Sequence, residues 1–230
     1  MAVKRLVIAL DGPAASGKST IAKRLAARLG FVYVDTGAMY RAVALWALRS
    51  NVDLADMHRL EQLAREAEIR FEPGGTQVQL NGEDVSEAIR APEVSAASSR
   101  IAVIPGVRRA LVQKQRALGE TASVVMEGRD IGTVVFPQAD VKVFLDAQPP
   151  VRADRRRKEL EQQGVLLPED EMQRSLRERD ERDRGRAEAP LMQAPDAAYL
   201  DTSLLTLDEV EQAVLKIIRD RTSNGKEFAA

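Results

Sequence analysis

Residues 12–19, Gly-Pro-Ala-Ala-Ser-Gly-Lys-Ser, have the spacing G-x-x-x-x-G-K-[ST] of a phosphate-binding loop. The two glycines let the backbone turn tightly, so that successive N–H groups point into one concavity that holds phosphate oxygens. Lys18 would reach the β- and γ-phosphates of a nucleoside triphosphate, and the Ser19 hydroxyl is the expected Mg²⁺ ligand. The residues expected to bind the triphosphate are Gly12, Pro13, Ala14, Ala15, Ser16, Gly17, Lys18, Ser19 and Thr20.

A predicted strand and a predicted helix flank this loop, which is the setting that the motif requires. Residues 6–10 are apolar and predict a buried strand. Residues 20–29 predict a helix whose apolar face holds Ile21, Leu25 and Leu29. The helix begins at the end of the loop, so the positive end of its dipole adds to the anion site. The sequence therefore predicts that the chain binds a nucleoside triphosphate.

Predicted strands and helices alternate along most of the remaining chain. This alternation implies right-handed crossovers and a parallel sheet with helices on both faces. The further predicted strands are residues 32–34, 123–126, 141–145 and 198–200. The further predicted helices are residues 38–49, one after Pro105, about 150–163, about 168–184, and one opened by a capping box at 206–209.

The segment from about 53 to 99 breaks the alternation. One amphipathic helix is predicted around residues 60–67, and a small antiparallel sheet follows it. Asn81-Gly82 predicts a hairpin because both positions tolerate positive φ, and Pro73-Gly74-Gly75 predicts the preceding turn. The three predicted strands are residues 69–71, 77–80 and 83–85.

Polar residues follow the predicted parallel strands at their carboxyl ends, where ligands gather in such sheets. Among them, Thr36 and Arg41 follow the second strand and Arg129 follows the third. Two guanidinium groups and a hydroxyl suit a dianionic monophosphate, which arginine binds bidentately. The region 152–186 mixes 11 basic with 10 acidic residues, and it ends in a helix that runs into a glycine break. This suits a helical lid that closes over phosphates and excludes water.

Composition limits the remaining possibilities. The 230 residues are 44% hydrophobic, with a formal net charge of −1 and no cysteine, which indicates a globular protein without disulfides, thiolate chemistry or a nucleic-acid surface. The single histidine, His58, lies in a polar stretch and excludes a histidine-based metal site or triad. No long apolar run or signal-peptide pattern is present, so we expect a cytoplasmic protein with no membrane contact. The absence of an apolar stripe favours a monomer.

Three classes of protein with this loop compete. A regulatory GTPase needs Asn-Lys-x-Asp and Asp-x-x-Gly motifs, which are absent. A motor or transport ATPase needs an acidic residue after an apolar strand, for which Glu127 is a weak match, and larger coupling elements. A small-molecule kinase needs a second anion site, bridging arginines and a cover, and the sequence offers candidates for each. A non-catalytic nucleotide switch remains as the rival of another class.

Three further motifs together resemble the bacterial cytidylate kinase family: Asp-Thr-Gly-Ala-Met-Tyr-Arg at 35–41, Glu-Gly-Arg-Asp-Ile-Gly-Thr-Val-Val-Phe-Pro at 127–137, and Arg-Asp-x-x-Asp-Arg-x-Arg at 179–186. The resemblance runs from about residue 3 to 221. It implies transfer of the γ-phosphoryl group of ATP to CMP or dCMP, with Mg²⁺. It also implies an α/β, adenylate-kinase-like fold: a central parallel sheet, a helical lid and a small antiparallel-sheet insertion in the monophosphate-binding region.

The resemblance implies one domain over residues 1–222 and a tail over 223–230. The core is expected at 1–52, 104–150 and 187–222, the monophosphate-binding insert at about 53–103, and the lid at about 151–186. Lys18, Arg129, Asp130, Arg179 and Arg186 are the expected catalytic residues. The expected CMP-binding residues are Thr36, Arg41 and Arg129 at the phosphate, Ser99, Arg108 and Asp130 at cytosine, and Arg179, Asp183 and Arg186 at the sugar and lid. Arg155 and Arg156 are expected to join them over the phosphates.

The cytosine assignment has a chemical basis. Cytosine presents an N4 amino donor beside N3 and O2 acceptors, whereas uracil presents an O4 acceptor and an N3–H donor. The Asp130 carboxylate can accept from the amino group while Arg108 donates to the acceptor side. Uracil would set O4 against a carboxylate and leave a buried group unpaired, which rejects it strongly. A uridylate/cytidylate or other monophosphate kinase of broader choice is the alternative within the same fold.

Overall fold

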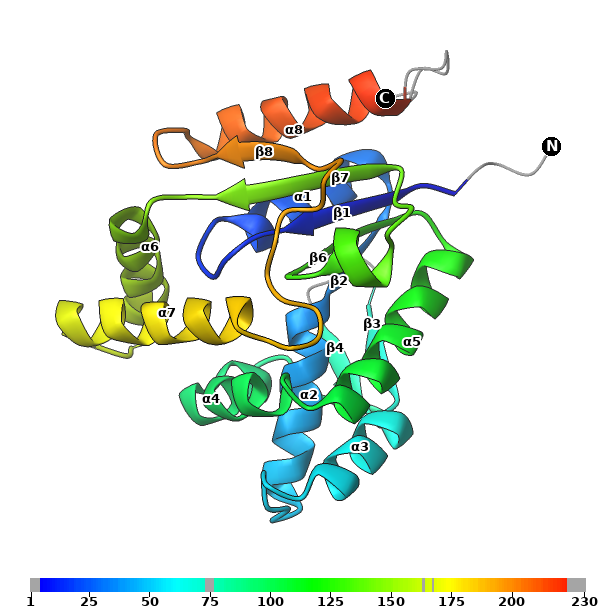
Figure 1. The fold of residues 1–230 in the computed structure, drawn as a ribbon, viewed down its shortest axis with the longest axis vertical. Helices are drawn as coiled ribbons and strands as arrows, with labels where there is room; N and C mark the ends of the chain where they lie inside the picture. The colour runs from blue at the N-terminus through cyan, green and yellow to red at the C-terminus, as the bar shows by residue number, and fades with distance from the viewer. Residues whose placement is uncertain (1–4, 73–76, 163, 167, 223–230) are drawn as a thin grey trace.

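A five-stranded parallel sheet forms the centre of the protein (Figure 1). The structure is a computed structural model, and it describes residues 5–72, 77–162, 164–166 and 168–222. Every neighbouring pair of strands is parallel, in the order β2-β6-β1-β7-β8. The strands are β1 (Val7–Asp11), β2 (Val32–Asp35), β6 (Val124–Gly128), β7 (Val141–Asp146) and β8 (Ala198–Asp201). The predicted α/β fold with a parallel central sheet is confirmed.

Helices cover both faces of this sheet. The described α-helices are α1 (Lys18–Leu29), α2 (Thr36–Arg49), α3 (Met57–Glu66), α4 (Pro92–Ile101), α5 (Pro105–Thr121), α6 (Pro149–Gln162), α7 (Glu169–Arg184) and α8 (Leu207–Thr222). Ile8 and Leu10 of β1 pack in one cluster with residues of α1 and α8, whereas Ala9 packs in another with Val112 of α5. Since side chains alternate across a strand, β1 is apolar on both faces and lies at the centre of the sheet.

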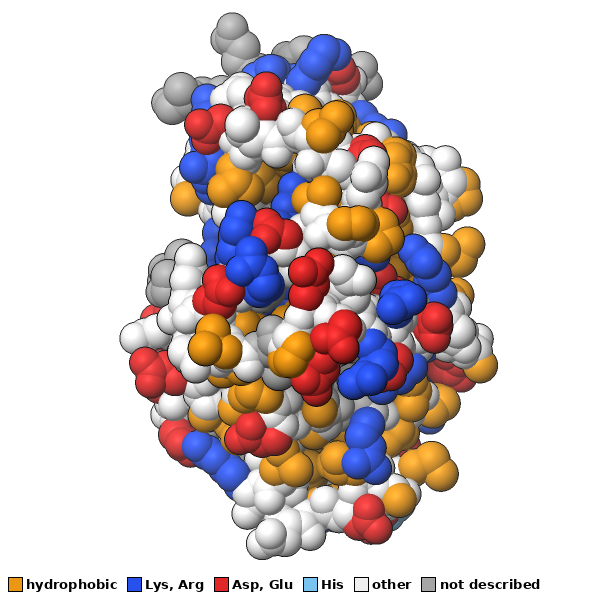
Figure 2. Space-filling model, turned by 90° about the vertical axis from the view of Figure 1, so that its left-hand side faces the viewer, with side chains coloured by type: hydrophobic (Ala, Val, Ile, Leu, Met, Phe, Trp, Pro, Cys, Tyr) orange, Lys and Arg blue, Asp and Glu red, His pale blue; other side chains and the backbone are white. Residues whose placement is uncertain are grey.

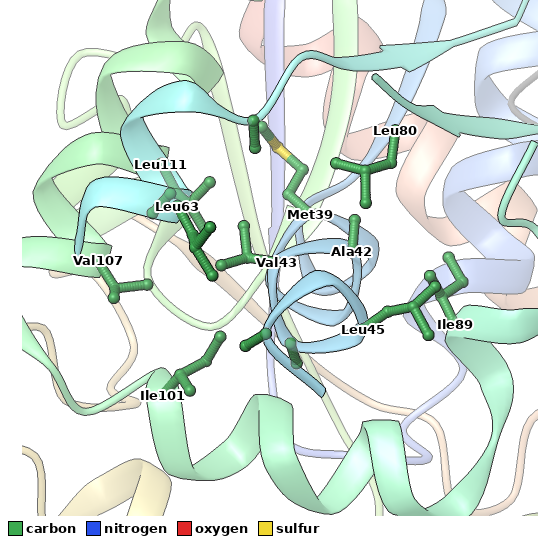
Figure 3. Close-up of a cluster of buried hydrophobic side chains, with 14 of the residues drawn as sticks. Met39, Ala42, Val43, Leu45, Leu63, Leu80, Ile89, Ile101, Val107 and Leu111 are labelled. Atoms are coloured by element: carbon green, nitrogen blue, oxygen red, sulfur yellow. The ribbon is translucent and has the colours of Figure 1, made fainter. Parts of the chain in front are cut away.

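A second core lies beside the sheet, around α2. Figure 3 shows Met39, Val43 and Leu45 of this helix among apolar side chains from the neighbouring segments. Leu63 of α3 and Leu111 of α5 are fully buried in the same cluster. The helix α2 is rich in alanine, and because alanine side chains are small, α3, α4 and α5 can approach it closely. This core fixes the region that carries the antiparallel sheet.

The predicted insertion is a three-stranded antiparallel sheet, in the order β3-β4-β5. Its strands are β3 (Ile69–Phe71), β4 (Val78–Leu80) and β5 (Glu83–Asp84). Asn81 and Gly82 have φ of 52° and 84°, so the predicted hairpin turn is confirmed. The predicted turn at Pro73-Gly74-Gly75 and the predicted tail after Thr222 lie outside the described residues. The 3₁₀ turn η1 (Ala88–Arg90) and α4 follow, and neither was predicted.

The charged helices α6 and α7 lie side by side at one end of the sheet (Figure 1). Figure 2 shows that this side of the molecule carries Lys and Arg interspersed with Asp and Glu. The chain returns from α7 to β8, and the predicted capping box at Thr206 and Glu209 is present at the start of α8. Within the described ranges, no helix combines the length and the apolar character needed to cross a membrane.

Candidate active site

A cavity of about 560 Å³ opens at the carboxyl ends of the parallel strands. Its wall combines the loop after β1, the ends of β2 and β6, the starts of α1 and α2, and parts of α4 to α7. The volume lies within the range of small-molecule sites. The predicted site residues that line it are Ala14, Ala15, Gly17, Lys18, Ser19, Thr20, Thr36, Arg41, Ser99, Arg108, Arg129, Asp130, Arg156, Arg179, Asp183 and Arg186.

The loop after β1 has the backbone that a phosphate cradle needs. Gly12, Ala15 and Gly17 all have positive φ, at 147°, 58° and 93°. A Cβ at Gly12 would lie 1.9 Å from the Leu145 carbonyl oxygen, so only glycine fits there. Gly12, Pro13 and Ser16 do not line the cavity, although they belong to the same loop.

Lys18 is buried and is folded back on the loop. Its Nζ donates to the Pro13 carbonyl at 2.5 Å and to the Ser16 hydroxyl at 3.2 Å. Burial and the nearby Arg129 guanidinium lower the pKa of Lys18 to about 7, with Glu127 and Asp11 acting in the opposite direction. An anion in the cavity would favour the charged ammonium form.

Ser19 lies against a buried carboxylate. Its Oγ donates to Glu127 Oε2 at 2.9 Å, and the Tyr33 hydroxyl donates to Glu127 Oε1. Burial and the Asp35 charge raise the pKa of Glu127, against opposing effects of Lys18 and the two hydroxyl donors. The sequence showed Glu127 only as a weak match to an ATPase motif, but the end of β6 places it beside Ser19. A hydroxyl and a carboxylate are oxygen ligands of the kind that Mg²⁺ accepts together with phosphates and water.

The predicted monophosphate contacts meet at the ends of β2 and β6. The Thr36 hydroxyl donates to the Glu127 carbonyl at 2.7 Å, and Arg41 pairs with Asp35 at 2.8 Å. The Asp35 carboxylate also accepts from the Ala38 N–H, and this cap starts α2 two residues before the predicted boundary. Arg129 Nε pairs with Asp183 Oδ2 of α7 at 3.0 Å.

The predicted cytosine contacts, Ser99, Arg108 and Asp130, are all buried and line the same cavity. Arg108 of α5 pairs with Asp130, and its Nη1 also donates to the Ala102 carbonyl at 3.2 Å. Ser99 Oγ is buried and has no hydrogen-bond partner in the described part of the chain. The Tyr40 ring lies 5.8 Å from the Arg108 guanidinium, a cation–π contact that the sequence did not predict. Burial raises the pKa of Asp130, although Arg108 and Arg186 oppose the shift.

A short π-helical turn, η2 (Ile131–Val135), holds Asp130 in place. The Asp11 carboxylate accepts the backbone N–H groups of Ile131 and Gly132 at 2.8 and 2.7 Å. Asp11 also ends β1, directly before the phosphate-binding loop. One buried carboxylate therefore ties the start of the loop to the turn after Asp130. Burial raises the pKa of Asp11 to about 6 despite the two amide donors.

The arginines that the sequence predicts for a lid differ in their partners. Asp183 accepts from both Arg129 and Arg186, whereas no hydrogen bond or ion pair joins the Arg179 guanidinium to any other described residue. Burial and Arg129 lower the pKa of Arg179 to about 10. An unpaired guanidinium that lines a cavity beside other cations favours an anionic ligand.

The two arginines expected over the phosphates lie in different surroundings. Arg156 lines the cavity and pairs with Glu159 at 2.9 Å. Arg155 does not line it; its guanidinium donates to the Thr202 hydroxyl and carbonyl at 2.9 and 2.7 Å. Of the predicted donor, acceptor and lid residues, the structure thus brings all but Gly12, Pro13, Ser16 and Arg155 to the wall of one cavity.

Comparisons with known proteins agree with this arrangement. The family model described as cytidylate kinase matches residues 8–220. A cytidylate kinase of Solibacter usitatus is 61% identical over 228 residues, which cover 98% of this chain and 97% of that protein. A cytidylate kinase of Pelotomaculum thermopropionicum is 49% identical, covering 95% and 96%. A bifunctional pantoate ligase/cytidylate kinase of Synechococcus is 43% identical, covering 94% of this chain and 41% of that protein.

Proposed function

The chain belongs to the cytidylate kinase family, and we propose that its cavity transfers the γ-phosphoryl group of ATP directly to the phosphate of CMP or dCMP. The products are ADP and CDP or dCDP. The family is one of nucleoside monophosphate kinases, so the protein is a phosphotransferase enzyme of pyrimidine nucleotide metabolism. The proposal includes the division into core, insert and lid, a cytoplasmic location and a monomeric state.

One observation supports this function above the others. A single cavity has the phosphate-binding loop on one wall and a buried Arg108–Asp130 pair with an unpartnered Ser99 hydroxyl on another. Arg41 and Arg129 line the same cavity. A nucleotide-binding switch needs the first wall alone. Transfer between two nucleotides needs both walls and cations between them.

The donor half binds the triphosphate through the loop N–H groups and Lys18. Ser19 and Glu127 would hold Mg²⁺, which when bound neutralises charge on the β- and γ-phosphate oxygens. Lys18 leaves its contacts with Pro13 and Ser16 and turns its ammonium group to the phosphates. Because phosphoryl transfer has a loose transition state, this half chiefly positions the donor and neutralises charge.

The acceptor half binds the monophosphate through Thr36, Arg41 and Arg129. No general base is required, because the acceptor is already an anionic phosphate. Among the described residues Arg179 has no hydrogen-bond or ion-pair partner, and it would stabilise the charge on the transferred group. The lid helices α6 and α7 keep water from the site, which prevents hydrolysis in place of transfer.

Coupled ADP-release assays with CMP, dCMP, UMP and AMP test the proposal. We expect CMP and dCMP to turn over with kcat/KM on the order of 10²-fold or more above UMP and AMP, because uracil leaves the Asp130 carboxylate opposite an acceptor. Equal or faster turnover of UMP or AMP would replace the proposal with a kinase of broader choice. ATP binding with no transfer to any monophosphate would favour the switch.

A further inference from the structure

Arg152, in the first turns of α6, joins three separate segments and is only 5% exposed. Its Nε donates to the Ala147 carbonyl at 3.0 Å, at the exit of β7. Its Nη1 donates to the Ala14 carbonyl at 3.2 Å, inside the phosphate-binding loop. Its Nη2 pairs with Asp180 Oδ2 of α7 at 2.6 Å. One guanidinium thus connects the sheet, the loop and the second lid helix, which Figure 1 shows beside α6.

Apolar contacts join the same segments. The Ala14 side chain is buried in a small hydrophobic cluster with Ala153 and Leu160 of α6 and with Met172 and Leu176 of α7. The loop therefore contributes a side chain to the core of the lid. A displacement of the lid helices would disturb the loop through this packing and through Arg152.

The contact with Ala14 bears on phosphate binding. In a trans peptide the carbonyl and the next N–H point in opposite directions, and the described residues contain no cis peptide. Because Arg152 holds the Ala14 carbonyl, the N–H of Ala15 points away from Arg152. Ala15 lines the cavity and has a φ of 58°, a conformation that is costly for alanine and needs support from its surroundings.

The contact with Asp180 bears on phosphoryl transfer. Asp180 is buried and directly follows Arg179, the lid arginine without a hydrogen-bond or ion-pair partner among the described residues. Asp183, one helical turn on, holds Arg129. A shift of Asp180 along or around α7 would therefore move the cations that face the reacting phosphates.

We propose that Arg152 is a positioning residue, which sets α7 in register with the phosphate-binding loop and so places Arg179 at the phosphoryl group. This inference rests on the proposed function for its effect on transfer. Its effect on the loop requires only that the loop binds ATP. Arg152 itself does not line the cavity, so it acts through Ala14 and through Asp180.

Arg152→Lys tests the inference, because lysine keeps the charge but cannot make the three directed contacts of a guanidinium. Asp180→Asn is the second variant, since it keeps the shape of the side chain and weakens only the pair. Arg157→Lys is the matched control on the same helix: the Arg157 side chain is 41% exposed, and among the described residues it pairs with Asp154 and Glu161 of α6 alone. Melting temperature is measured for all three variants.

We expect Arg152→Lys to weaken ATP binding about fivefold or more by calorimetry without an acceptor, and to lower kcat about tenfold or more. Asp180→Asn should also lower kcat. Arg157→Lys should change neither kcat nor the affinity for ATP. In a double-mutant cycle, Arg152→Lys should lower kcat less than about threefold once Arg179→Lys is present, because the two act as a unit.

Three results would overturn the inference: an unchanged ATP affinity in Arg152→Lys, losses of kcat that multiply fully with those of Arg179→Lys, or a lowered melting temperature with normal kcat and ATP affinity. A wild-type protein that binds ATP but does not phosphorylate CMP would overturn the proposed function instead. The ATP-binding measurement would still decide the role of Arg152 in that case, because it involves no acceptor.

Discussion

Arg108 and Asp130 form an ion pair whose side chains are 5% and 9% exposed, and both residues line the cavity that Ser99 also lines. Burying two charges is costly unless further hydrogen bonds support them. Arg108 is also bound to the Ala102 carbonyl, and Asp11 fixes the turn that follows Asp130. The pair is therefore held in one geometry before any ligand arrives, and a carboxylate can accept a second hydrogen bond beside that of Arg108.

Asp130→Asn should lower kcat/KM for CMP on the order of 10²-fold. The amide NH₂ group is a donor, and it would face another donor, either the cytosine amino group or the Arg108 guanidinium. ATP affinity should stay within about twofold, since Asp130 lies outside the donor half. The kcat/KM ratio of UMP to CMP should rise. Steady-state kinetics with both acceptors and calorimetry with ATP check this. If ATP affinity collapsed while the acceptor ratio stayed constant, Asp130 would not read the base.

Lys18→Ala should abolish turnover, with a loss on the order of 10²–10³-fold or more, because it removes a preorganised charge from the transferred phosphoryl group. Folding should survive, since the substitution removes a buried ammonium whose pKa is already lowered. Circular dichroism and the ADP-release assay measure the two effects. Lys216→Ala is the control, because Lys216 lies exposed on α8 and pairs with Asp220. Near-normal turnover in Lys18→Ala would contradict its place at the phosphates.

ATP binding should take up a proton near pH 8. Lys18 has a pKa of about 7 in the folded protein, against 10.5 ordinarily, so it is mostly neutral at that pH and becomes charged beside phosphates. Uptake should vanish below about pH 6, where Lys18 is already protonated. Calorimetry in two buffers of different ionisation enthalpy measures it. Lys18→Ala should show no such uptake, and uptake that persists in that variant would assign the proton to another group.

The lowered pKa of Lys18 also determines how the free energy of unfolding of the ligand-free protein changes with pH. Between about pH 7 and 10.5 the unfolded chain holds a proton on Lys18 that the folded protein does not, so this group makes the free energy of unfolding rise with pH there. Below pH 7 both states are protonated, and the cost of the buried charge is fully present. Urea unfolding of the wild type and Lys18→Ala across this window isolates the contribution.

The sequence predicted the parallel sheet and its helices because their signals are local: apolar runs for β1 and β6, and helical spacing in α3 and α8. It did not predict α4, in which half of the ten residues are Ala or Ser. Only Val94, Ala97 and Ile101 mark its apolar face. This face is buried because α4 packs against α2, a contact that the local sequence does not reveal. For this reason the place of Ser99 followed from the family resemblance and not from a local pattern.

Contacts between distant segments account for the rest of the site. The turn after Asp130 is held by Asp11, more than a hundred residues earlier in the chain. The Glu127 carboxylate accepts hydrogen bonds from the hydroxyls of Ser19 and Tyr33, which lie on other elements. The loop motif accepts any residue at the position of Ala14, yet its side chain packs among apolar residues of α6 and α7. Residue types could place these groups near one cavity, but only the register of the sheet decides which of them touch.

Gly12→Ala should be far more damaging than Gly30→Ala. Both glycines have positive φ, so each alanine costs about 1 kcal/mol in backbone strain. At Gly30 the new methyl group meets open space, whereas at Gly12 it would lie 1.9 Å from the Leu145 carbonyl oxygen. The loop must then move, at a further cost of roughly 1–3 kcal/mol, and ATP binding should be lost. Urea unfolding and calorimetry compare the two variants. Equal unfolding energies would contradict the close approach.

Tyr33→Phe should destabilise the protein by about 1–3 kcal/mol at pH 8, because it leaves one oxygen of the buried Glu127 carboxylate without its donor. Burial and Asp35 raise the pKa of Glu127, and the Tyr33 hydroxyl acts against that rise. Without the hydroxyl, the pKa should rise further. The ionised carboxylate carries the cost, so the loss of stability should be smaller near pH 5, where more of Glu127 is protonated.

The matched control for this prediction is Tyr199→Phe. The Tyr199 side chain is exposed, and its hydroxyl lies 3.5 Å from Asp146, so its loss should change stability by less than about 0.5 kcal/mol at either pH. Urea unfolding of both variants at the two pH values gives the comparison. If Tyr33→Phe were equally destabilising at both pH values, the effect would come from packing around the ring. A dependence on pH would instead show that Tyr33 supports the ionised form of Glu127, the form that can hold a cation beside Ser19.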